Sequence, residues 1–506
     1  MNHERVNCER EDEYRILPTV LLFIDCQPTT NLSSRRRRET DNYKKMNSIK
    51  NKSEMLTVKE LSQMLFLLFS VNAAKRATFA VFVLAFFSLS LNAQSILTLE
   101  EAKAVTLANN YGIKVAQNNV QIAENNTDKR ANGYLPTVNA TGGLNGSLGG
   151  SSQTFNSGME ANVSNAFQWG ANAAVNANYT VFDKRRDLTL EQLKENVTLV
   201  NLQLRQTIEN NLLQVYNGFF QVAQLEENIA ALEQAMSISR ERLQRANYGL
   251  EYGQGSGLTV LNAEVDIQRD SVNILNAQQQ LANARRNLNV LMGRNTTEFF
   301  VTDADLVYAE NLQLTELTKA AKDENIALQI NRKNLSVNEM TLGIIDAERK
   351  PTVTAGASYT YSYSDNAAEA FITSSNSRGF GGNVGLAWNI FDGGSRHIRE
   401  ENTRVNLSTQ KLQITQLEQQ TEAQIINAWE SYQNALYILE VQENAVATNQ
   451  ENFARTEEQL RIGRISSLEF RQAQLNLLNA QVSLNQAKFD AKIREIQMLQ
   501  LAGKLP

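Results

Sequence analysis

The sequence is poor in the residues from which catalytic and metal sites are usually built. Its 506 residues include only two cysteines and two histidines. Cys8 and Cys26 precede a predicted cleavage point after Ala93, so the mature chain has no disulfide and no thiol nucleophile. His397 is then the one remaining histidine, which nearly excludes a histidine-based zinc cluster or a Ser-His-Asp triad. We expect no enzyme activity, no metal and no cofactor.

The sequence also lacks a basic bias and has few prolines. The net charge of -5 and the pI near 5.5 argue against a nucleic-acid partner, which favours a basic face. The four-arginine run at 35–38 is interpreted as a solvated charge cluster without a partner. Of five prolines, only Pro136, Pro351 and Pro506 follow the predicted cleavage point, and none interrupts a helix proposed below.

Residues 75–93 have the pattern of a secretory signal peptide. Lys75-Arg76 is followed by an apolar stretch at 77–91 and by a small residue, Ala93. The apolar stretch is short for a bilayer span, so a retained membrane anchor is the less favoured alternative. Residues 1–74 are either an over-extended start or a disordered cytoplasmic extension, and we assign them no function.

The rest of the chain contains an internal duplication. The pattern Gly253-x4-Leu258-x4-Ala263 returns as Gly463-x4-Leu468-x4-Ala473, and the offset of 210 residues (463 − 253) holds as far as Gly293 and Gly503 (503 − 293). The duplication predicts a first structural repeat at 94–293, a linker at 294–317 and a second repeat at 318–506. Each repeat reads helix, strand, strand, long helix and helix.

Long amphipathic helices are expected in both repeats. Apolar residues recur at three- and four-residue steps over 186–248 and 395–461. A helix over 186–248 would be about 95 Å long, which is typical of a coiled coil or a helical tube. Shorter helices at 98–132 with 258–292, and at 318–348 with 467–502, match the long ones in length and would stack end to end beside them. Tight turns follow at 253–257 and 461–464. A glycine-rich phosphate loop is the alternative at the first turn, but no P-loop lysine follows.

Four segments read as strands of an unusual kind. Apolar and polar residues alternate along them, most weakly in the first, and none contains a charged residue; they lie at 136–149, 169–182, 351–362 and 379–391. One face is apolar and aromatic, whereas the other carries asparagine, serine, threonine and glycine. Such strands are typical of a transmembrane barrel, because lipid offers no partner for charge. A soluble sandwich sheet is the alternative.

Four strands are too few to close a barrel. Bacterial barrels have at least about eight strands, and an open edge in lipid leaves unpaired backbone groups. Two copies would give eight strands and a filled interior, whereas three copies would give twelve strands and a lumen. We therefore predict an α+β membrane protein. Four β-strands per protomer contribute to a shared 12-stranded trimeric barrel, which a long periplasmic α-helical tunnel of coiled-coil hairpins continues.

Several short motifs carry a resemblance to a known family. They are Leu97-Thr98-Leu99-Glu100-Glu101-Ala102, Tyr134-Leu135-Pro136, Phe391-Asp392-Gly393-Gly394-Ser395-Arg396 and the two Gly-x4-Leu-x4-Ala hairpins. Over residues 95–504 the chain resembles the TolC-like outer-membrane efflux protein family. The resemblance implies the outer-membrane channel of a tripartite efflux pump or a type I secretion system. The implied partners are two further copies in a homotrimer, a periplasmic adaptor (membrane fusion) protein, an inner-membrane pump and outer-membrane lipid.

The resemblance also implies roles for individual residues. Hairpin tips that face the adaptor would comprise Tyr252, Gly253, Leu258, Gly463, Ser466, Ser467 and Leu468. Simple helix-terminating turns are the alternative for these residues. The pore constriction would fall on Glu469 and Gln472, with Thr259 at the corresponding position of the first repeat. Because only Glu469 is acidic, we expect a weak cation filter.

The strand-to-helix turns are expected to be structural. Asp183 and Asp392 each stand between a strand and a long helix, and both are predicted to be N-caps. Gly393 and Gly394 would let the chain bend there. Pro136 and Pro351 would begin strands.

Two other classes of function stay open. An outer-membrane barrel enzyme would need a nucleophile with its base, and the sequence shows no partner for His397. A secreted coiled-coil adhesin would account for the long helices but not for the uncharged strands. The cargo, the class of pump, the true translation start and the way a tunnel would open are not predicted.

Overall fold

The computed structural model describes residues 96–309, 311–366 and 372–505. These residues belong to one unit, Gln94–Pro506. The predicted extension at 1–74 and the predicted signal peptide at 75–93 lie outside the described residues. No helix in the described part of the chain is both long enough and apolar enough to cross a membrane.

One order of elements occurs twice along this unit. Two short helices are followed by two strands, a long helix and a second long helix. In the first half these are α3 (Leu99–Asn109), α4 (Tyr111–Asn126), β2 (Thr137–Thr154), β3 (Glu160–Phe182), α5 (Lys184–Glu251) and α6 (Gly257–Met292). In the second half they are α7 (Leu314–Glu324), α8 (Ile326–Ala347), β5 (Thr352–Asp365), β6 (Ser374–Ala387), α9 (Ser395–Arg461) and α10 (Ser467–Leu501).

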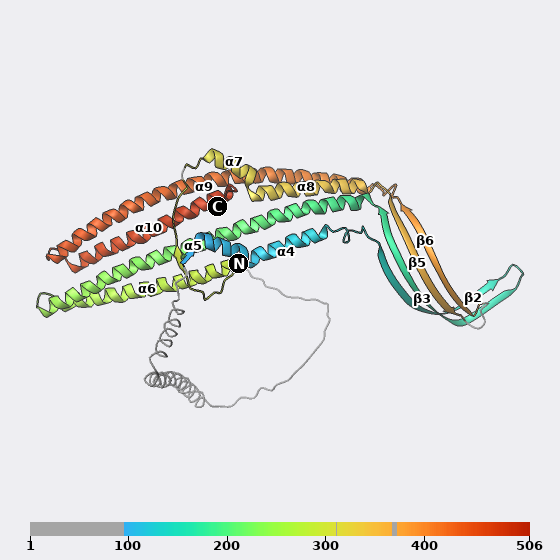
Figure 1. The fold of residues 1–506 in the computed structure, drawn as a ribbon, viewed down its shortest axis with the longest axis horizontal. Coiled ribbons are helices and arrows are strands. Elements are labelled where there is room, and N and C mark those ends of the chain that lie inside the picture. Colours follow the sequence, from blue (N-terminus) through green and yellow to red (C-terminus); the bar gives the residue numbers. More distant parts are fainter. Residues whose placement is uncertain (1–95, 310, 367–371, 506) are drawn as a thin grey trace, which may run out of the picture. The chain divides into compact units, whose positions relative to one another are not determined.

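The expected long helices are present. The helix α5 has 68 residues and α9 has 67, so each is about 100 Å long at 1.5 Å per residue. Figure 1 shows α6 folded back along α5, and α10 folded back along α9. Each pair forms a helical hairpin whose turn lies at the end of the molecule far from the strands.

The helices expected at 98–132 and 318–348 are each broken in two, at Asn110 and Asn325. Asn110 caps α4, because its side-chain oxygen accepts from the Ile113 amide at 3.0 Å, while its Nδ2 donates to the Leu291 carbonyl at 2.7 Å. Asn325 likewise caps α8 and donates to the Leu501 carbonyl at 3.0 Å. Each asparagine thus joins the start of one helix to the end of another. In Figure 1, α4 and α6 follow one another beside α5, and α8 and α10 follow one another beside α9.

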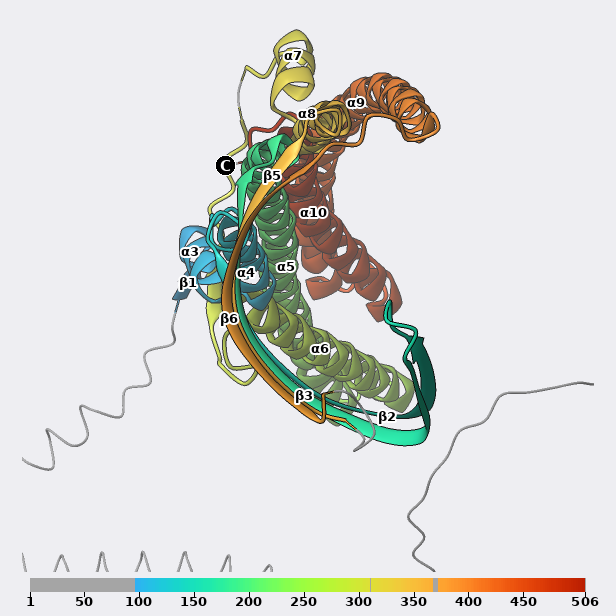
Figure 2. The same cartoon turned by 90° about the vertical axis from the view of Figure 1, so that its right-hand side faces the viewer.

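The strands form one antiparallel sheet in the order β2-β3-β5-β6. Figure 2 shows this sheet as a single curved band. The strands β2 and β3 are longer than the predicted 136–149 and 169–182, and they pair as far as Thr154 and Glu160 after a bulge between Gly149 and Ser151. The strand β6 ends at Ala387, not at Phe391. The indole of Trp388 instead donates to the Arg349 carbonyl at 3.0 Å.

The strand register keeps one kind of side chain on each face. Val175 pairs with Tyr359, which pairs with Phe380, and all three are apolar and exposed. The next row, of Asn176, Ser358 and Gly381, is small and polar. The predicted alternation is therefore confirmed. A small parallel pair that was not predicted, β1 (Ile96–Thr98) with β4 (Val301–Asp303), lies beside the helices.

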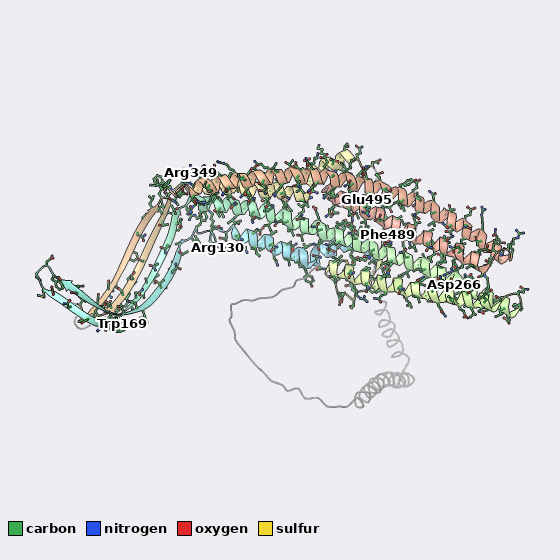
Figure 3. The ribbon with its side chains drawn as sticks, turned by 180° about the vertical axis from the view of Figure 1, so that it is seen from behind. Arg130, Trp169, Asp266, Arg349, Phe489 and Glu495 are labelled. Carbon is green, nitrogen blue, oxygen red and sulfur yellow. The ribbon has the colours of Figure 1, made fainter. Side chains whose placement is uncertain are left out.

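The main hydrophobic core lies midway along the helices, not against the sheet. Phe219, Phe220 and Leu288 pack there with Phe300, from the segment between the two halves, and with Phe489 of α10. Figure 3 places Phe489 between the sheet and the hairpin turns. The second half adds a smaller cluster of α7, α9 and α10 residues. The sheet thus extends away from the core, and no other part of residues 96–309, 311–366 and 372–505 forms a layer over either of its faces (Figure 1).

Candidate functional site

The two hairpin turns present apolar side chains to the surroundings. Tyr252, at the end of α5, is 74% exposed, and Leu258 of α6 is also exposed. In the second hairpin Leu468 is 79% exposed. Gly253 and Gly463 both have φ of +70°, in the left-handed region that ends many helices. The residues predicted at the hairpin tips therefore do lie at the turns.

The helices that follow the two turns, α6 and α10, each begin with a serine N-cap, and the cap of α10 has additional hydrogen bonds. Ser256 accepts from the Thr259 amide, whereas Ser466 and Glu469 form a reciprocal capping box. The Glu469 carboxylate accepts from the Ser466 amide at 2.7 Å and from its hydroxyl at 2.9 Å. Hydrogen bonds from the Ser466 backbone and then its side chain lower the pKa of Glu469. The Ser-x-x-Glu pattern at 466–469 is a recognised signature of this box, and our reading of the sequence did not use it.

The predicted constriction residues do not all lie together. Thr259 of α6 and Gln472 of α10 line one cavity between the two hairpins, with a volume of about 520 Å³. Ser466, Ser467 and Leu468 line it as well. Glu469 is not among the lining residues, and Tyr252 and Gly253 lie outside it. The structure thus joins part of the predicted constriction to the tip of the second hairpin.

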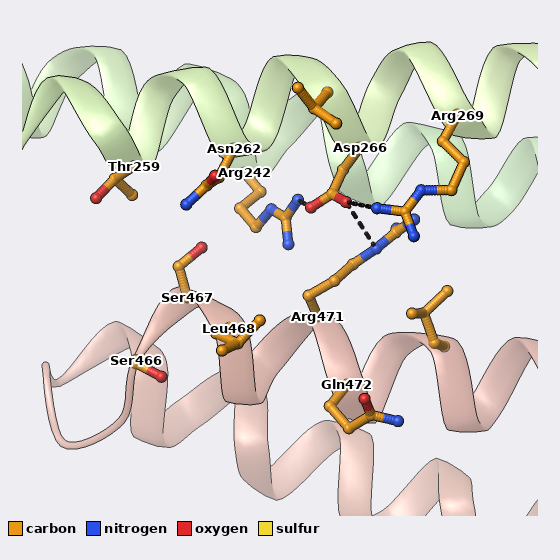
Figure 4. Close-up of a pocket in the computed structure, with 12 residues that line it drawn as sticks. Arg242, Thr259, Asn262, Asp266, Arg269, Ser466, Ser467, Leu468, Arg471 and Gln472 are labelled. Carbon is orange, nitrogen blue, oxygen red and sulfur yellow. Dashed lines mark hydrogen bonds and ion pairs between the residues drawn. The ribbon is translucent and has the colours of Figure 1, made fainter.

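A charged cluster, formed by Arg242, Asp266, Arg269, Asp270 and Arg471, adjoins this cavity, and only Arg269 in it is exposed. Figure 4 shows the four members that line the cavity, Arg242, Asp266, Arg269 and Arg471. Arg242 donates to Asp266 Oδ2, and Arg269 Nη2 donates to Asp266 Oδ1 at 3.0 Å. Arg471 reaches across from α10 and contacts Asp270 through two nitrogens, at 2.5 and 3.0 Å. The cluster therefore joins α5 and α6 of the first hairpin to α10 of the second.

Two polar side chains complete the cluster. Ser239 donates to Asp270 at 2.6 Å and accepts from Arg471 at 3.0 Å, while Gln474 donates to the Ala235 carbonyl. The sequence analysis missed this cluster. The sequence did hold one indication of it, because Arg471 and Gln474 stand at positions where the periodicity of α10 predicts buried apolar residues. They lie one turn apart on the face of α10 that also buries Phe470 and Leu478.

The strand-to-helix turns differ between the halves. Asp183 is the N-cap of α5, and its carboxylate accepts from the Arg185 amide at 3.0 Å. Asp392 is not an N-cap, contrary to the prediction, because Gly394 with φ of +87° occupies that position. The Asp392 side chain instead accepts from the amides of Gly394 and Arg396. The strands β2 and β5 begin at Thr137 and Thr352, directly after Pro136 and Pro351.

Charged side chains gather where the sheet meets the helices. Arg186 donates to the carbonyls of Gly133 and Thr180, and its guanidinium lies 4.1 Å from the ring centroid of Tyr134. Figure 3 places Arg130 and Arg349 in the same region. Among residues 96–309, 311–366 and 372–505, no group of three or more metal-ligating side chains is close enough to hold an ion. His397 is exposed, with Glu401 at 3.5 Å.

Comparison with known proteins agrees with this architecture. A family model described as outer membrane efflux protein matches residues 104–294 and 317–504. The outer membrane efflux protein BepC of Brucella suis biovar 1 (strain 1330) is 20% identical over 415 residues, covering 81% of this chain and 86% of BepC.

Solved structures give the same result for the fold. The Campylobacter jejuni CmeC outer membrane channel superposes with a TM-score of 0.64 at 14% identity, covering 80% of this chain and 85% of CmeC. The outer-membrane channel OprN superposes with a TM-score of 0.62 at 17% identity, covering 81% of this chain and 90% of OprN. The family model spans both halves of the described structure, so the chain belongs to the outer membrane efflux protein family and its location is the outer membrane.

Proposed function

We propose that three copies of this chain form the outer-membrane duct of a tripartite efflux pump. The sheet carries the proposal, because its apolar face is exposed and no second layer from the described part of the chain covers it. From Gly379 to Ala387, and in the paired rows of β5 and β3, no charged residue occurs. Nine residues are about the length that a tilted strand needs to cross the hydrocarbon core. Arg130, Arg349 and their charged neighbours would mark the membrane boundary at the base of the sheet.

A single copy cannot be the membrane-spanning form. The strands β2 and β6 are the two edges of the sheet, and their outer sides have no partner among the residues that the structure describes. Edges of this kind cost several kcal/mol per unpaired backbone group in lipid. Pairing of β2 of one copy with β6 of the next removes both edges. Three copies give twelve strands, and the row of Asn176, Ser358 and Gly381 would then face a polar lumen.

The helices carry matching unpartnered stripes. On α9 exposed apolar residues recur every seven residues, at Ile398, Val405 and Leu412. On the α4–α6 line a second exposed stripe consists of Tyr111, Val115, Ile122, Leu258, Leu261, Val265, Val272 and Leu275. Seven-residue spacing is the repeat of coiled-coil seams. We infer that the α9 stripe, which lies near the sheet, packs against the α4 part of the second stripe in the next copy, and that the two halves at 94–293 and 318–506 act as six alternating units around one bore.

The seam can be tested with one charged substitution. Leu412 is 69% exposed, so Leu412→Glu leaves the core of the single copy intact but places a carboxylate in the proposed seam. We expect the detergent-extracted protein to change from trimers to monomers by light scattering. Asn406→Glu is the matched control, because Asn406 is exposed on α9 and lies about 100° around the helix from Val405. Equal trimer content in both variants would refute the seam.

We also propose that the hairpin turns bind the adaptor, since exposed apolar side chains at the end of a helical hairpin are suited to a partner of complementary shape. The double change Tyr252→Ser and Leu468→Ser should abolish drug resistance conferred by the complete pump while trimers still form in the outer membrane. Resistance equal to that of the unchanged protein would contradict docking at the turns. A type I secretion system would use the same duct, and loss of a secreted protein with unchanged drug resistance would favour it.

A further inference from the structure

The charged cluster between the hairpins has more positive than negative charge. Arg242, Arg269 and Arg471 face two carboxylates, Asp266 and Asp270. The side chains of Arg242 and Arg471 are each only 6% exposed. Taking a charge out of water is costly unless an opposite charge lies beside it. The two buried arginines are matched in number by Asp266 and Asp270, and the more exposed Arg269 gives the cluster a net charge of +1.

Two of the arginines also have nitrogen atoms that are not satisfied. Nε of Arg242 and Nε of Arg471 are buried and make no hydrogen bond to any described residue. The nearest carboxylate oxygen to Arg471 Nε, Asp266 Oδ1, is 3.6 Å away, beyond hydrogen-bonding range. Each buried N–H group left without an acceptor costs free energy. Both Nε atoms have almost no accessible surface, so an anion beside the cluster would balance its net charge through the other guanidinium nitrogens.

The cavity beside the cluster is suited to such an acceptor. It has a volume of about 520 Å³ and is lined by Arg242, Arg269 and Arg471. The first turn of α10, at Ser467 and Leu468, lines the same cavity. The first amides of a helix lack intrahelical partners and carry positive potential, so they attract anions. In Figure 4 the three guanidinium groups converge on Asp266 from both hairpins.

We propose that this cavity binds a small free oxyanion, a carboxylate or phosphate, between α6 and α10. Arg269 and Arg471 would donate to it from opposite sides, and Arg242 would balance its charge from behind. A lipid headgroup is not the source, because Arg242 lies 58 residues along α5 from Lys184 (242 − 184), or about 87 Å from the sheet. The site goes beyond the proposed duct function, since it can be occupied whether or not the protein conducts.

The test is binding of inorganic phosphate, and separately of acetate, to the full chain in an uncharged, phosphate-free detergent. Titration calorimetry should show one saturable site per chain for one or both anions. Arg269→Gln should weaken binding at least tenfold, as expected for loss of a charged hydrogen bond. The Arg269 side chain is 58% exposed, so this change should leave the fold intact.

Two further variants separate binding from folding. Asp266→Asn removes the carboxylate that competes for the arginines, so it should tighten anion binding; a purely structural role would give no gain. Arg461→Gln, on the exposed side of the second turn and outside the cavity, should bind as the unchanged protein does. Absence of saturable binding of either anion, or binding that Arg269→Gln and Asp266→Asn leave unchanged, would overturn the proposal. A protein that binds phosphate but does not conduct would instead count against the duct alone.

Discussion

The two halves of the chain agree in the middle of the helices and differ at both ends. At the middle, Asn110 and Asn325 make the same two contacts, and Gly293 and Gly503 make the same left-handed ending. At the sheet end, β2 and β3 have 18 and 23 residues whereas β5 and β6 have 14 each. At the hairpin turns, α6 begins with a serine N-cap alone, whereas α10 begins with a capping box. We infer that the middle is fixed by packing, whereas the ends are where the halves acquired separate roles.

Substitution of the glycines at the ends of α6 and α10 should reduce the free energy of unfolding more than any other change proposed here. A Cβ at Gly293 would lie 2.7 Å from the Asn109 carbonyl oxygen, and one at Gly503 would lie 2.5 Å from the Glu324 carbonyl oxygen. Since backbone cannot move aside cheaply, Gly293→Ala and Gly503→Ala should each cost about 3 kcal/mol or more in urea unfolding. Gly463→Ala is the control: it has a similar φ of +70° but no atom within 4 Å, so about 1 kcal/mol is expected. Equal costs at Gly463 and Gly503 would show that the close approach is unimportant.

Substitution of the asparagines at the helix breaks should have the next largest effect on the free energy of unfolding. Asn110→Ala and Asn325→Ala each remove a cap and leave a carbonyl of the neighbouring helix unpaired, so each should cost about 2 kcal/mol by the same assay. Asn201→Ala removes only a bond to the Val197 carbonyl within its own helix and should cost less than about 0.5 kcal/mol. If one asparagine mattered and the other did not, the two halves would not be equivalent in the middle.

Substitution of the two serine N-caps should show that the hairpin turns of the two halves differ in stability. Ser256→Ala should cost about 1 kcal/mol. Ser466→Ala should cost more near neutral pH, because it also removes the hydroxyl that holds Glu469. The lowered pKa of Glu469 means that its contribution is present above the ordinary pKa of 4.5 and is lost as pH falls through the lowered value. The difference between the two variants should therefore vanish in acid. A difference independent of pH would refute the role of Glu469 in the cap.

Ion selectivity should respond least. If Glu469 contributes a ring of three carboxylates, Glu469→Gln should slightly reduce the cation preference of single channels, and Thr259→Glu should raise it. The shift is expected to be small because salt screens exposed charges and Glu469 is already held by Ser466. Unchanged cation selectivity in Glu469→Gln would show that the ring assignment is wrong.

The local parts of this architecture could be read from the sequence because they depend on local periodicity. The alternation around Val175 and Tyr359 and the seams of α5 and α9 repeat often enough to indicate strand and helix. The helix breaks were missed, since Asn110 and Asn325 do not disturb the apolar periodicity and their side chains act on a helix about 180 residues away. The role of Gly394 was missed because a left-handed cap with two adjacent glycines moves the helix start past Asp392.

The candidate site was harder to predict because it lies between the two halves. The family resemblance pointed to Thr259 and Gln472 through their distance from the turn glycines, and they do line the same cavity. Arg471 was not chosen, because its partner Asp270 lies 201 residues away and only the packing of one hairpin on the other brings them together. Ion pairs between residues so far apart in the chain produce no recognisable spacing pattern in the sequence.

The central claim is that each chain supplies a third of a closed, lipid-bounded duct. The most direct test extracts the protein with detergent from the outer-membrane fraction. The mass of the extracted particle gives the number of copies, and planar-bilayer conductance shows whether it forms a channel. The account predicts a trimer that inserts and conducts in single-channel steps. A protein that stays monomeric and dissolved without detergent, and that inserts into no bilayer, would contradict it.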